Sequence, residues 1–413
     1  MNLNREIPVL NWEQFLASRT TGMKSSAIRE LLKLTEQPDI ISFAGGLPAP
    51  EFFPLREVEE ACRYVLRTEG AKALQYSTTE GHVELRQYLA RSMHKYGVPA
   101  VVGNVLLTSG SQQALDLIGK VLIDRGDYVI TCRPTYLGAI QAWNAYGARY
   151  HTVNLDDDGM VVDELEQAYA QVLADSGKPP RFVYVLPNFH NPAGTTLSLE
   201  RRHKLAEIAR RLNLPIVEDD PYGQLRFEGE DLPPICSLVP ERTIYLSTFS
   251  KTLTPGLRLG WIVCPEALMR SFVMAKQGAD LHTGTFVQYV ANDICQRGFI
   301  KPHVERLRAV YRQRRDTMLE AMAEFWPADC CSWTRPQGGL FLWARVPESI
   351  NTVDFLRRAV EEKVAYVPGI NFYPNEDGGF NAMRLNFSYC PPETIVEGIR
   401  RLGTALKREL AKG

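Results

Sequence analysis

Short apolar runs alternate with longer amphipathic stretches across the middle of the chain, and this alternation constrains the fold more than any other feature. From about residue 56 to 300, helical patterns such as 112–122 and 199–212 separate the apolar runs. Nearly continuous apolar strands joined by helices are typical of a mostly parallel sheet covered on both faces. We therefore expect an α/β fold with strands at 105–107, 128–131, 182–186, 216–217, 244–246 and 261–263.

The two ends of the chain differ in pattern from this middle region. Beyond about residue 300 we expect a long charged helix at 302–325, a strand at 337–346, a helix at 353–362, short strands at 365–368 and 382–387, and a final helix. Before residue 56 there is an amphipathic helical pattern at 26–34 and a short strand that ends in a Gly/Pro turn, 40–48. Because 413 residues exceed the usual size of one core, we divide the chain into an N-terminal arm with a mobile helix (1–55), a large domain (56–300) and a smaller α+β domain (301–413).

Charge and cysteine usage exclude several classes of protein. The chain has 47 Lys and Arg against 48 Asp and Glu, whereas nucleic-acid binders usually carry a basic excess. No apolar run approaches the ~20 residues that span a bilayer, and the N-terminus lacks the apolar core of a signal peptide. The eight cysteines form no C-x-x-C pair and no zinc-finger spacing. We expect a cytoplasmic protein with no metal site and with neither nucleic acid nor membrane as a partner.

Ligands of such sheets bind outside the carboxyl ends of the strands, and the first of these ends carries small polar residues. The sequence Thr108-Ser109-Gly110-Ser111-Gln112 follows the strand at 105–107, and Ser111 is a good N-cap for the next helix. Free backbone N–H groups at such a helix start can cradle a phosphate. Many α/β loops start a helix in the same way without binding anything. The segment is neither a Walker loop nor a Gly-x-Gly-x-x-Gly fingerprint, which disfavours ATP and NAD.

Three further strand ends carry residues that could face a flat, charged ligand. Tyr136 follows Pro134 and could stack on a heteroaromatic ring, or belong to the core. The amide of Asn191 could donate to a ligand oxygen or cap its own turn. Asp219 stands between two other carboxylates before Tyr222, an arrangement that favours a nearby cation such as a protonated pyridine nitrogen. A solvated acidic turn is the simpler alternative.

Lys251 is the strongest candidate for covalent chemistry. It directly follows the apolar strand at 244–246, after Ser250, and Arg258 lies seven residues later. A lysine that is desolvated near other cations has a lowered pKa and can act as a nucleophile. Arg258 would bind an anion, most naturally a phosphate. Arg384 lies on the predicted strand at 382–387 and fits the capture of a carboxylate, although an exposed edge-strand arginine has the same pattern.

The ordered set of these motifs resembles the fold type I aminotransferases of class I and II from end to end. Within them the chain most resembles the 2-aminoadipate and kynurenine aminotransferases, through the segments 42–48, 74–76 and 278–282. The resemblance implies a homodimer that moves an amino group between an L-amino acid and a 2-oxo acid with pyridoxal 5′-phosphate. A decarboxylase or β-lyase on the same fold is the alternative. The sensing domain of a transcription regulator is a third, disfavoured because we find no helix-turn-helix pattern.

The resemblance also implies a role for each site residue. Lys251 carries the cofactor and moves a proton between the substrate α-carbon and the cofactor. Asp219 pairs with the ring nitrogen, Asn191 and Tyr222 bind the ring 3-oxygen, and Tyr136 stacks on the ring. The phosphate is held by Ser111, Gln112, Ser250 and Arg258, with Tyr76 reaching it from the partner subunit. The substrate is bound by Arg384, Asn191 and Gly45.

Arg29 is the candidate reader of the substrate side chain. In the resembling 2-aminoadipate enzymes an arginine of this helix meets the distal carboxylate of the substrate. The helical pattern leaves the alternative that Ile28, Leu31 and Leu32 form a buried stripe and Arg29 faces water. Two departures from the family pattern, His190-Asn191-Pro192-Ala193-Gly194 and Gly223 after Tyr222, bear on the pocket and not on the core chemistry.

Overall fold

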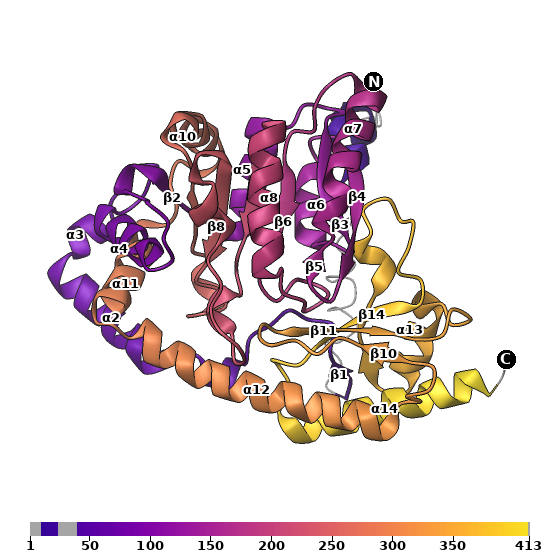
Figure 1. The fold of residues 1–413 in the computed structure, drawn as a ribbon. Coiled ribbons are helices and arrows are strands. Elements are labelled where there is room, and N and C mark those ends of the chain that lie inside the picture. The colour runs from indigo at the N-terminus through magenta and orange to yellow at the C-terminus, as the bar shows by residue number, and fades with distance from the viewer. Residues whose placement is uncertain (1–9, 24–38, 412–413) are drawn as a thin grey trace, which may run out of the picture.

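A large sheet, covered by helices on both faces, forms the centre of the molecule in a computed structural model that describes residues 10–23 and 39–411 (Figure 1). Its eight strands lie in the order β2 (Val105–Thr108), β9 (Gly260–Val263), β8 (Thr243–Thr248), β7 (Ile216–Asp219), β6 (Val183–Val185), β3 (Tyr128–Arg133), β4 (Arg149–Asp156) and β5 (Gly159–Met160). The pairs β8–β7, β7–β6, β6–β3 and β3–β4 are parallel, and β9 runs antiparallel to both of its neighbours. The predicted mostly parallel α/β sheet is confirmed.

Each face of this sheet has its own apolar core. One face packs against α5 (Ser111–Leu122), α6 (Leu137–Asn144) and α10 (Glu266–Asp280). The other packs against α7 (Leu165–Ser176), α8 (Leu199–Leu212) and α9 (Ile235–Leu238) at the β3 end of the sheet. Towards β2 the same face is covered by α2 (Leu55–Thr68), α4 (Val83–His94) and α11 (Thr285–Gln296), with the short α3 (Gly70–Ala73) beside them. Burial on both faces explains why these strands are almost entirely apolar.

A second, antiparallel sheet lies below the carboxyl ends of the large-sheet strands (Figure 1). Its strands lie in the order β10 (Ser332–Trp333), β11 (Phe341–Arg345), β14 (Ala382–Asn386) and β13 (Val367–Pro368). Helices α12 (Ile300–Phe325), α13 (Thr352–Glu361) and α14 (Pro392–Leu410) accompany it, and α12 packs along α14. Nine short 3-10 helices complete the described structure: 12–15, 18–22, 50–52, 102–104, 162–164, 223–225, 240–242, 255–257 and 369–372.

The N-terminal segment joins this second part of the molecule. The strand β1 (Ile41–Ser42) pairs in parallel with β12 (Val364–Ala365). The backbone N–H of Asn386 then donates to the carbonyl of Phe43 at 2.9 Å. These bonds place the segment that follows between the two sheets. The Ala44 carbonyl accepts from Arg384 on β14, and the Gly46 carbonyl accepts from Lys251 after β8.

Two strand predictions need correction. The predicted strand at 337–346 is shorter, because Gly339 has a φ of 73° and interrupts the extended backbone before β11. The strand predicted at 365–368 is divided at Tyr366 between β12 and β13, which belong to different sheets. The sequence did not indicate β4, because Val153 is its one fully buried residue. The helix predicted at 26–34 lies outside the described residues.

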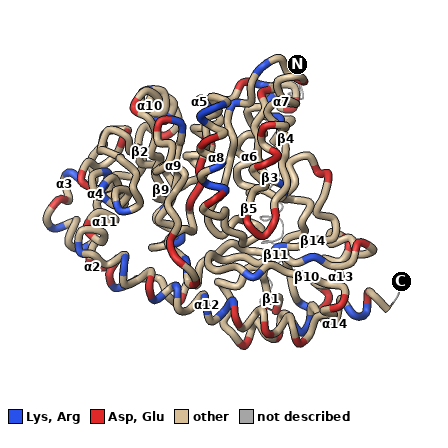
Figure 2. Tube along the Cα trace, viewed as in Figure 1, with Lys and Arg blue, Asp and Glu red and all other residues tan. Residues whose placement is uncertain are grey.

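Acidic and basic residues both occur along the outer helices α12 and α14 (Figure 2). On α14, Glu397 is bonded to both Arg400 and Arg401, as expected for neighbouring positions on one helix face. Within residues 10–23 and 39–411, no helix is both long and apolar enough to cross a membrane.

Candidate active site

A cavity of about 250 Å³ lies at the edge of the large sheet where β6, β7 and β8 end, facing β11 and β14. Ten residues predicted from the sequence line it: Ser111, Gln112, Tyr136, Asn191, Asp219, Tyr222, Ser250, Lys251, Arg258 and Arg384. A larger cavity of about 370 Å³ lies behind the loop at 220–226, lined by Tyr96, Arg226 and Trp261 among others. We place the active site in the smaller cavity, because buried groups with shifted pKa values converge there.

The start of α5 and Arg258 form one end of this cavity. Gly110 is the residue before the helix and has a φ of 81°, so Ser111 is the first helical residue and not the predicted N-cap. A Cβ on Gly110 would lie 2.7 Å from Nη2 of Arg258, which shows how closely this guanidinium covers the helix start. Arg258 itself has a φ of 50°, a strained backbone conformation for a residue other than glycine. A cation over free helical N–H groups suits a phosphate.

Lys251 lies in the turn that follows β8, with its side chain in the cavity. Its Nζ donates to the carbonyl oxygen of Gly46 at 2.7 Å. Burial, followed by the charges of Arg384 and Arg258, lowers the pKa of Lys251 to about 8. The amine is therefore far more available as a nucleophile and base near neutral pH than an ordinary lysine.

Asp219 ends β7 with one carboxylate oxygen bonded and one free. Its Oδ2 accepts a hydrogen bond from the hydroxyl of Tyr184 at 2.8 Å. Its Oδ1 is buried and has no hydrogen-bond partner among the described residues. Burial raises the pKa of Asp219 to about 7, with the Tyr184 bond opposing the shift and Asp220 adding to it. A buried free oxygen on such a carboxyl fits a cationic or protonated ligand group.

The two neighbouring carboxylates are satisfied within the protein and point elsewhere. Glu218 accepts from the backbone N–H groups of Ile235 and Cys236 at 2.9 and 2.7 Å. Asp220 accepts from Asn188, Gly223 and Tyr245. The prediction that three crowded carboxylates need a cation therefore applies to Asp219 alone.

Asn191, Tyr222 and Tyr136 surround the middle of the cavity. The amide of Asn191 donates to the Tyr222 hydroxyl at 3.2 Å. The Tyr136 ring packs directly against Gly138, because a Cβ atom on Gly138 would come within 2.5 Å of the ring. Gln112 fixes the same turn by donating to the Gly138 carbonyl at 3.0 Å. Burial raises the pKa of Tyr136 to about 12, so this phenol stays neutral at physiological pH.

Arg384 on β14 brings a buried guanidinium to the opposite side of the cavity. It donates to Oδ1 of Asn191 at 2.9 Å and to the carbonyl of Ala44 at 2.7 Å. Its Nε is buried without a partner among the described residues, and its charge lies 4.2 Å from the ring centre of Phe341. Burial lowers the pKa of Arg384 to about 10. A desolvated guanidinium with a spare donor suits a carboxylate ligand.

Two predicted site residues, Gly45 and Tyr76, do not line this cavity. Gly45 is buried beside it, and Gly46 takes the lining position that the sequence assigned to Gly45. Tyr76 lies outside the cavity with 78% of its surface exposed. Arg29 lies outside the described residues.

The sequence model of the family described as aminotransferase class I and II matches residues 39–402. The chain belongs to this family. It is 47% identical over 409 residues to aromatic-amino-acid aminotransferase 1 of Thermococcus litoralis, covering 98% of this chain and 97% of that protein.

Two solved aminotransferase structures are similar over almost the whole length. A kynurenine aminotransferase of Pyrococcus horikoshii in complex with PMP is 44% identical with a TM-score of 0.92, covering 96% of this chain and 98% of that one. An α-aminoadipate aminotransferase of Thermus thermophilus, complexed with N-(5′-phosphopyridoxyl)-L-leucine, is 41% identical with a TM-score of 0.90, covering 98% and 100%.

The family confirms the predicted enzyme class and its cofactor, pyridoxal 5′-phosphate. The cavity fits this group at three points. The free Oδ1 of Asp219 suits a protonated ring nitrogen, the Lys251 amine suits the aldehyde, and Arg258 over the start of α5 suits the phosphate.

The sequence did not single out Tyr184, Phe341 and Gly46. Tyr184 could have been predicted from the sequence, because a hydroxyl in the middle of a buried apolar strand needs a hydrogen-bond partner. The two departures from the family pattern lie outside the lining of the cavity. Gly223 allows a close approach, since a Cβ there would come 2.5 Å from Oδ2 of Asp220. His190 contacts Cys132 within the core at 3.3 Å.

Proposed function

We propose that this aminotransferase transfers the amino group of an acidic, aromatic or branched aliphatic L-amino acid to a 2-oxo acid such as 2-oxoglutarate. The observation that carries the proposal is the meeting of the Lys251 amine, the free oxygen of Asp219 and the Arg384 guanidinium in one cavity. The range of substrates follows the aromatic, kynurenine and aminoadipate relatives. The two half-reactions share one covalently bound cofactor, so the kinetics are ping-pong.

The residues around the cavity divide into three groups by the part of the reaction that they serve. Asp219, Asn191, Tyr222 and Tyr136 hold the cofactor ring. Ser111, Gln112, Ser250 and Arg258 hold the phosphate, joined by Tyr76 of the partner subunit. Arg384 binds the α-carboxylate of the substrate, with Asn191 and the segment at Gly45 beside it.

When bound, pyridoxal phosphate supplies an electron sink for charge that develops at the substrate α-carbon. Asp219 keeps the ring nitrogen protonated, because its free oxygen lies in a buried site where an ion pair is strong. Arg384 fixes the α-carboxylate and thereby orients the α-carbon hydrogen toward Lys251. The Lys251 amine removes and returns that proton, a task that suits its lowered pKa.

The side chain of the substrate is proposed to meet Arg29. An arginine there would favour glutamate and 2-aminoadipate through their distal carboxylates. If the helix predicted from the sequence at 26–34 forms and moves, it would admit aromatic and aliphatic side chains. The aminoadipate enzyme that binds a leucine adduct supports such dual use.

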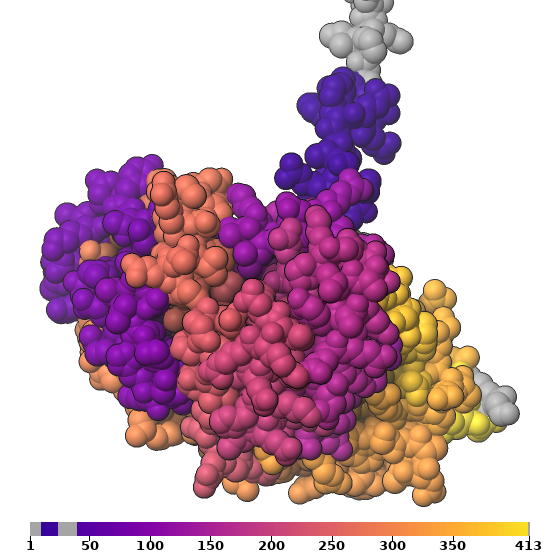
Figure 3. Space-filling model, turned by 45° about the horizontal axis from the view of Figure 1, so that its top comes forward, coloured from indigo at the N-terminus to yellow at the C-terminus, as the bar shows by residue number. Residues whose placement is uncertain are grey.

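The enzyme is proposed to be a cytoplasmic homodimer. Residues 10–23 project from the body of the molecule (Figure 3) and expose Trp12, Phe15 and Leu16 by 71, 66 and 61%. Exposed apolar side chains of this kind favour contact with another chain. The exposed Tyr76 fits the same arrangement, because it can serve a cavity only by reaching one on a partner.

The division into an arm (1–55), a large domain (56–300) and a small domain (301–413) is likewise proposed. It is supported by the distribution of site residues over two sheets, with Lys251 beside the large sheet and Arg384 on the small one. The pairing of β1 with β12 supports the association of the arm with the small domain.

A spectral titration tests the proposal. The holoenzyme is mixed with each L-amino acid of a panel, and the visible absorption band of the bound cofactor is followed. We expect acidic, aromatic and branched aliphatic donors to bleach the band, and 2-oxoglutarate to restore it.

The donors that act would define the substrate class. A band that no amino acid bleaches reversibly would overturn amino-group transfer in favour of a decarboxylase or β-lyase. Arg384→Lys is the matched variant, in which half-saturating donor concentrations rise because a lysine cannot bind a carboxylate through two parallel donors.

A further inference from the structure

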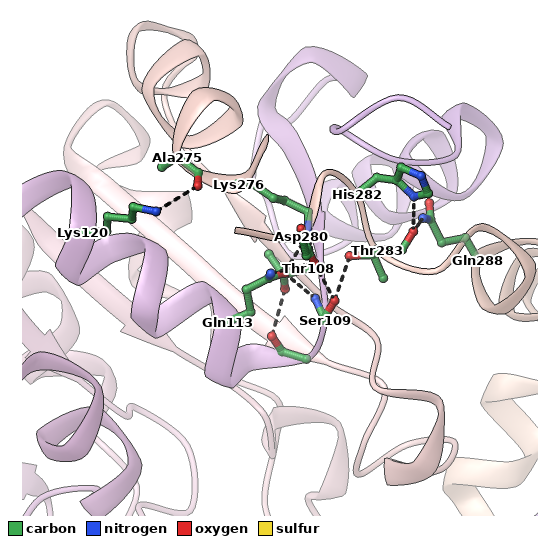
Figure 4. Close-up of polar contacts among 11 residues, drawn as sticks. Thr108, Ser109, Gln113, Lys120, Ala275, Lys276, Asp280, His282, Thr283 and Gln288 are labelled. Atoms are coloured by element: carbon green, nitrogen blue, oxygen red, sulfur yellow. Dashed lines mark hydrogen bonds and ion pairs between the residues drawn. The ribbon is translucent and has the colours of Figure 1, made fainter. Parts of the chain in front are cut away.

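A buried lysine outside the cavity, Lys276 on α10, is not used by the proposed chemistry. Its side chain is fully buried, and its Nζ donates to Oε1 of Gln113 at 2.7 Å and to the two oxygens of Asp280 at 2.8 and 2.9 Å (Figure 4). Burial disfavours the charged carboxyl of Asp280, but the bonds from Lys276, Gln113 and Ser109 outweigh it and keep the pKa of Asp280 below its usual range.

This ion pair holds the loop that precedes the phosphate-binding end of α5. Gln113 donates from Nε2 to Oδ2 of Asp280 at 2.7 Å, and its Oε1 accepts from the backbone N–H of Ser109 at 2.8 Å. The Ser109 hydroxyl donates to the same Asp280 oxygen at 3.0 Å. Gly110, which precedes α5, and Ser111, its first residue, lie between Ser109 and Gln113 in the chain.

The turn after Asp280 holds the segment that carries Tyr76. Nε2 of His282 accepts from the backbone N–H of Ser77 at 3.3 Å, and the His282 ring packs edge-on against Tyr76 with the ring centres 5.8 Å apart. Gln288 ties the turn to α4 by donating to the Thr283 carbonyl at 2.6 Å and accepting from the N–H of His82. One short stretch, 276–283, thus contacts both the phosphate loop and the Tyr76 segment.

A role in stability alone does not account well for this arrangement. Lys276 is fully buried, whereas the Asp280 side chain keeps 26% of its surface exposed. An ion pair that requires a charge to be buried seldom stabilises a protein more than apolar residues of the same volume would. What such an ion pair adds is directional specificity, because each oxygen and each N–H group fixes the position of one hydrogen-bond partner. Here the partners are the two segments that the proposed function assigns to phosphate binding.

We propose that Lys276 and Asp280 form a positioning pair that sets the phosphate-binding loop of its own subunit and the Tyr76 segment that serves the partner. The inference rests on the proposed cofactor site. Its consequence is that cofactor affinity depends on two residues that do not line the cavity.

The first test measures the dissociation constant of pyridoxal phosphate for the apoenzyme of Lys276→Met and Asp280→Asn. We expect affinity to fall by roughly tenfold or more in each, since hydrogen bonds to charged groups are lost. Lys120→Met is the matched control. Lys120 lies in the same interface between α5 and α10 and donates to the Ala275 carbonyl at 3.4 Å (Figure 4), so its loss should leave the affinity unchanged.

Hydrogen–deuterium exchange of the apoenzymes provides a readout that does not depend on cofactor. In Lys276→Met and Asp280→Asn we expect faster exchange in both 108–113 and 74–80, and in Lys120→Met in neither. Wild-type exchange in either segment of the two variants would overturn the proposal.

The double variant Lys276→Met/Asp280→Leu separates positioning from stability, and it remains informative if the single variants fail to fold. Because this double variant leaves no unpaired buried charge, its unfolding midpoint should return to that of the wild-type protein. Its affinity for pyridoxal phosphate should stay weak, because the hydrogen bonds to Gln113 and Ser109 are still missing. Recovery of both would reduce the pair to a structural role and overturn the inference. A wild-type protein that binds no pyridoxal phosphate would instead contradict the proposed function, so the two failures are distinguishable.

Discussion

Tyr184 determines which oxygen of Asp219 is available to a ligand. Its hydroxyl occupies Oδ2, and its ring is held edge-on against Trp143 with the ring centres 4.9 Å apart. A buried carboxyl with one such donor keeps its orientation and part of its charge, because hydrogen bonds to the ionised form oppose the effect of burial. Tyr184 is therefore a positioning residue for Asp219.

Tyr184→Phe removes this donor and should raise the pKa of Asp219 further above its usual range. We expect the affinity for pyridoxal phosphate to fall by roughly 10-fold, the size of one hydrogen bond to a charged group. A fluorescence titration of the apoenzyme measures it. Tyr366→Phe is the control, because that buried hydroxyl donates to the Thr352 carbonyl far from the cavity. Equal losses of affinity in both variants would contradict the role of Tyr184.

The lowered pKa of Lys251 predicts a pH dependence for cofactor uptake. The neutral amine reacts with the aldehyde, and burial places the pKa near 8. We expect the uptake rate of the apoenzyme to rise by at least about tenfold per pH unit well below pH 8 and to level off above it. Asp219, with a pKa of about 7, ionises over the same range and favours uptake in the same direction. The uptake rate is measured by stopped flow. If it keeps rising up to pH 10, the pKa of Lys251 is that of an ordinary lysine and the prediction is wrong.

At the scale of elements, helix α14 packs closely against residues 41–46, the N-terminal segment that borders the cavity. A Cβ on Gly398 would lie 2.6 Å from the Phe43 ring and 2.8 Å from a methyl group of Ile41. The same segment supplies the carbonyl groups of Ala44 and Gly46, which accept from Arg384 and Lys251. The small residue on α14 thus sets the distance of these carbonyl groups from the cavity.

Gly398→Ala should displace this segment and destabilise the enzyme. We expect a loss of about 1–3 kcal/mol in the free energy of unfolding, typical of an overpacked core, together with a raised KM for the amino donor. Urea unfolding and steady-state kinetics measure the two effects. Gly70→Ala is the control, since a Cβ there meets nothing within 4 Å, and it should be neutral or slightly stabilising. A neutral Gly398→Ala would show that α14 can shift freely.

The elements that could be predicted from the sequence are those whose position follows from a local pattern. Lys251 and Asn191 follow buried strands and Asp219 ends one, and parallel strands bring their carboxyl ends to one edge. The role of Gly46 could not be predicted, because it depends on the pairing of β1 with a strand more than 300 residues later. The capping role expected of Ser111 failed because Gly110, in a left-handed conformation, already occupies that position.

At the scale of the whole molecule, the exposed Tyr76 does not line the cavity of its own chain. If each cavity is completed by the partner, a single subunit cannot be fully active by itself. Cofactor binding and dimer formation then stabilise each other, because whatever binds the assembled state shifts the equilibrium toward it.

Mixing two inactive variants tests this sharing of sites. Tyr76→Ala removes the residue donated to the partner, and Lys251→Ala removes the residue that acts in its own cavity. A hybrid dimer holds one cavity with both residues intact. After unfolding and refolding together in equal amounts, we expect recovery of about a quarter of wild-type activity, since half of the dimers are hybrids with one intact site of two. No recovery above the unmixed variants would place Tyr76 in its own subunit.

The pairing of β1 with β12 also governs when the cavity can form during synthesis. Residues 41–46 leave the ribosome early, yet the strand they join, and Arg384 that binds the Ala44 carbonyl, emerge more than 300 residues later. At ~5–20 residues per second, that interval is tens of seconds, during which the large sheet can assemble but its cavity stays open on one side. A nascent chain can therefore meet its cofactor at Lys251 before it is able to hold a substrate.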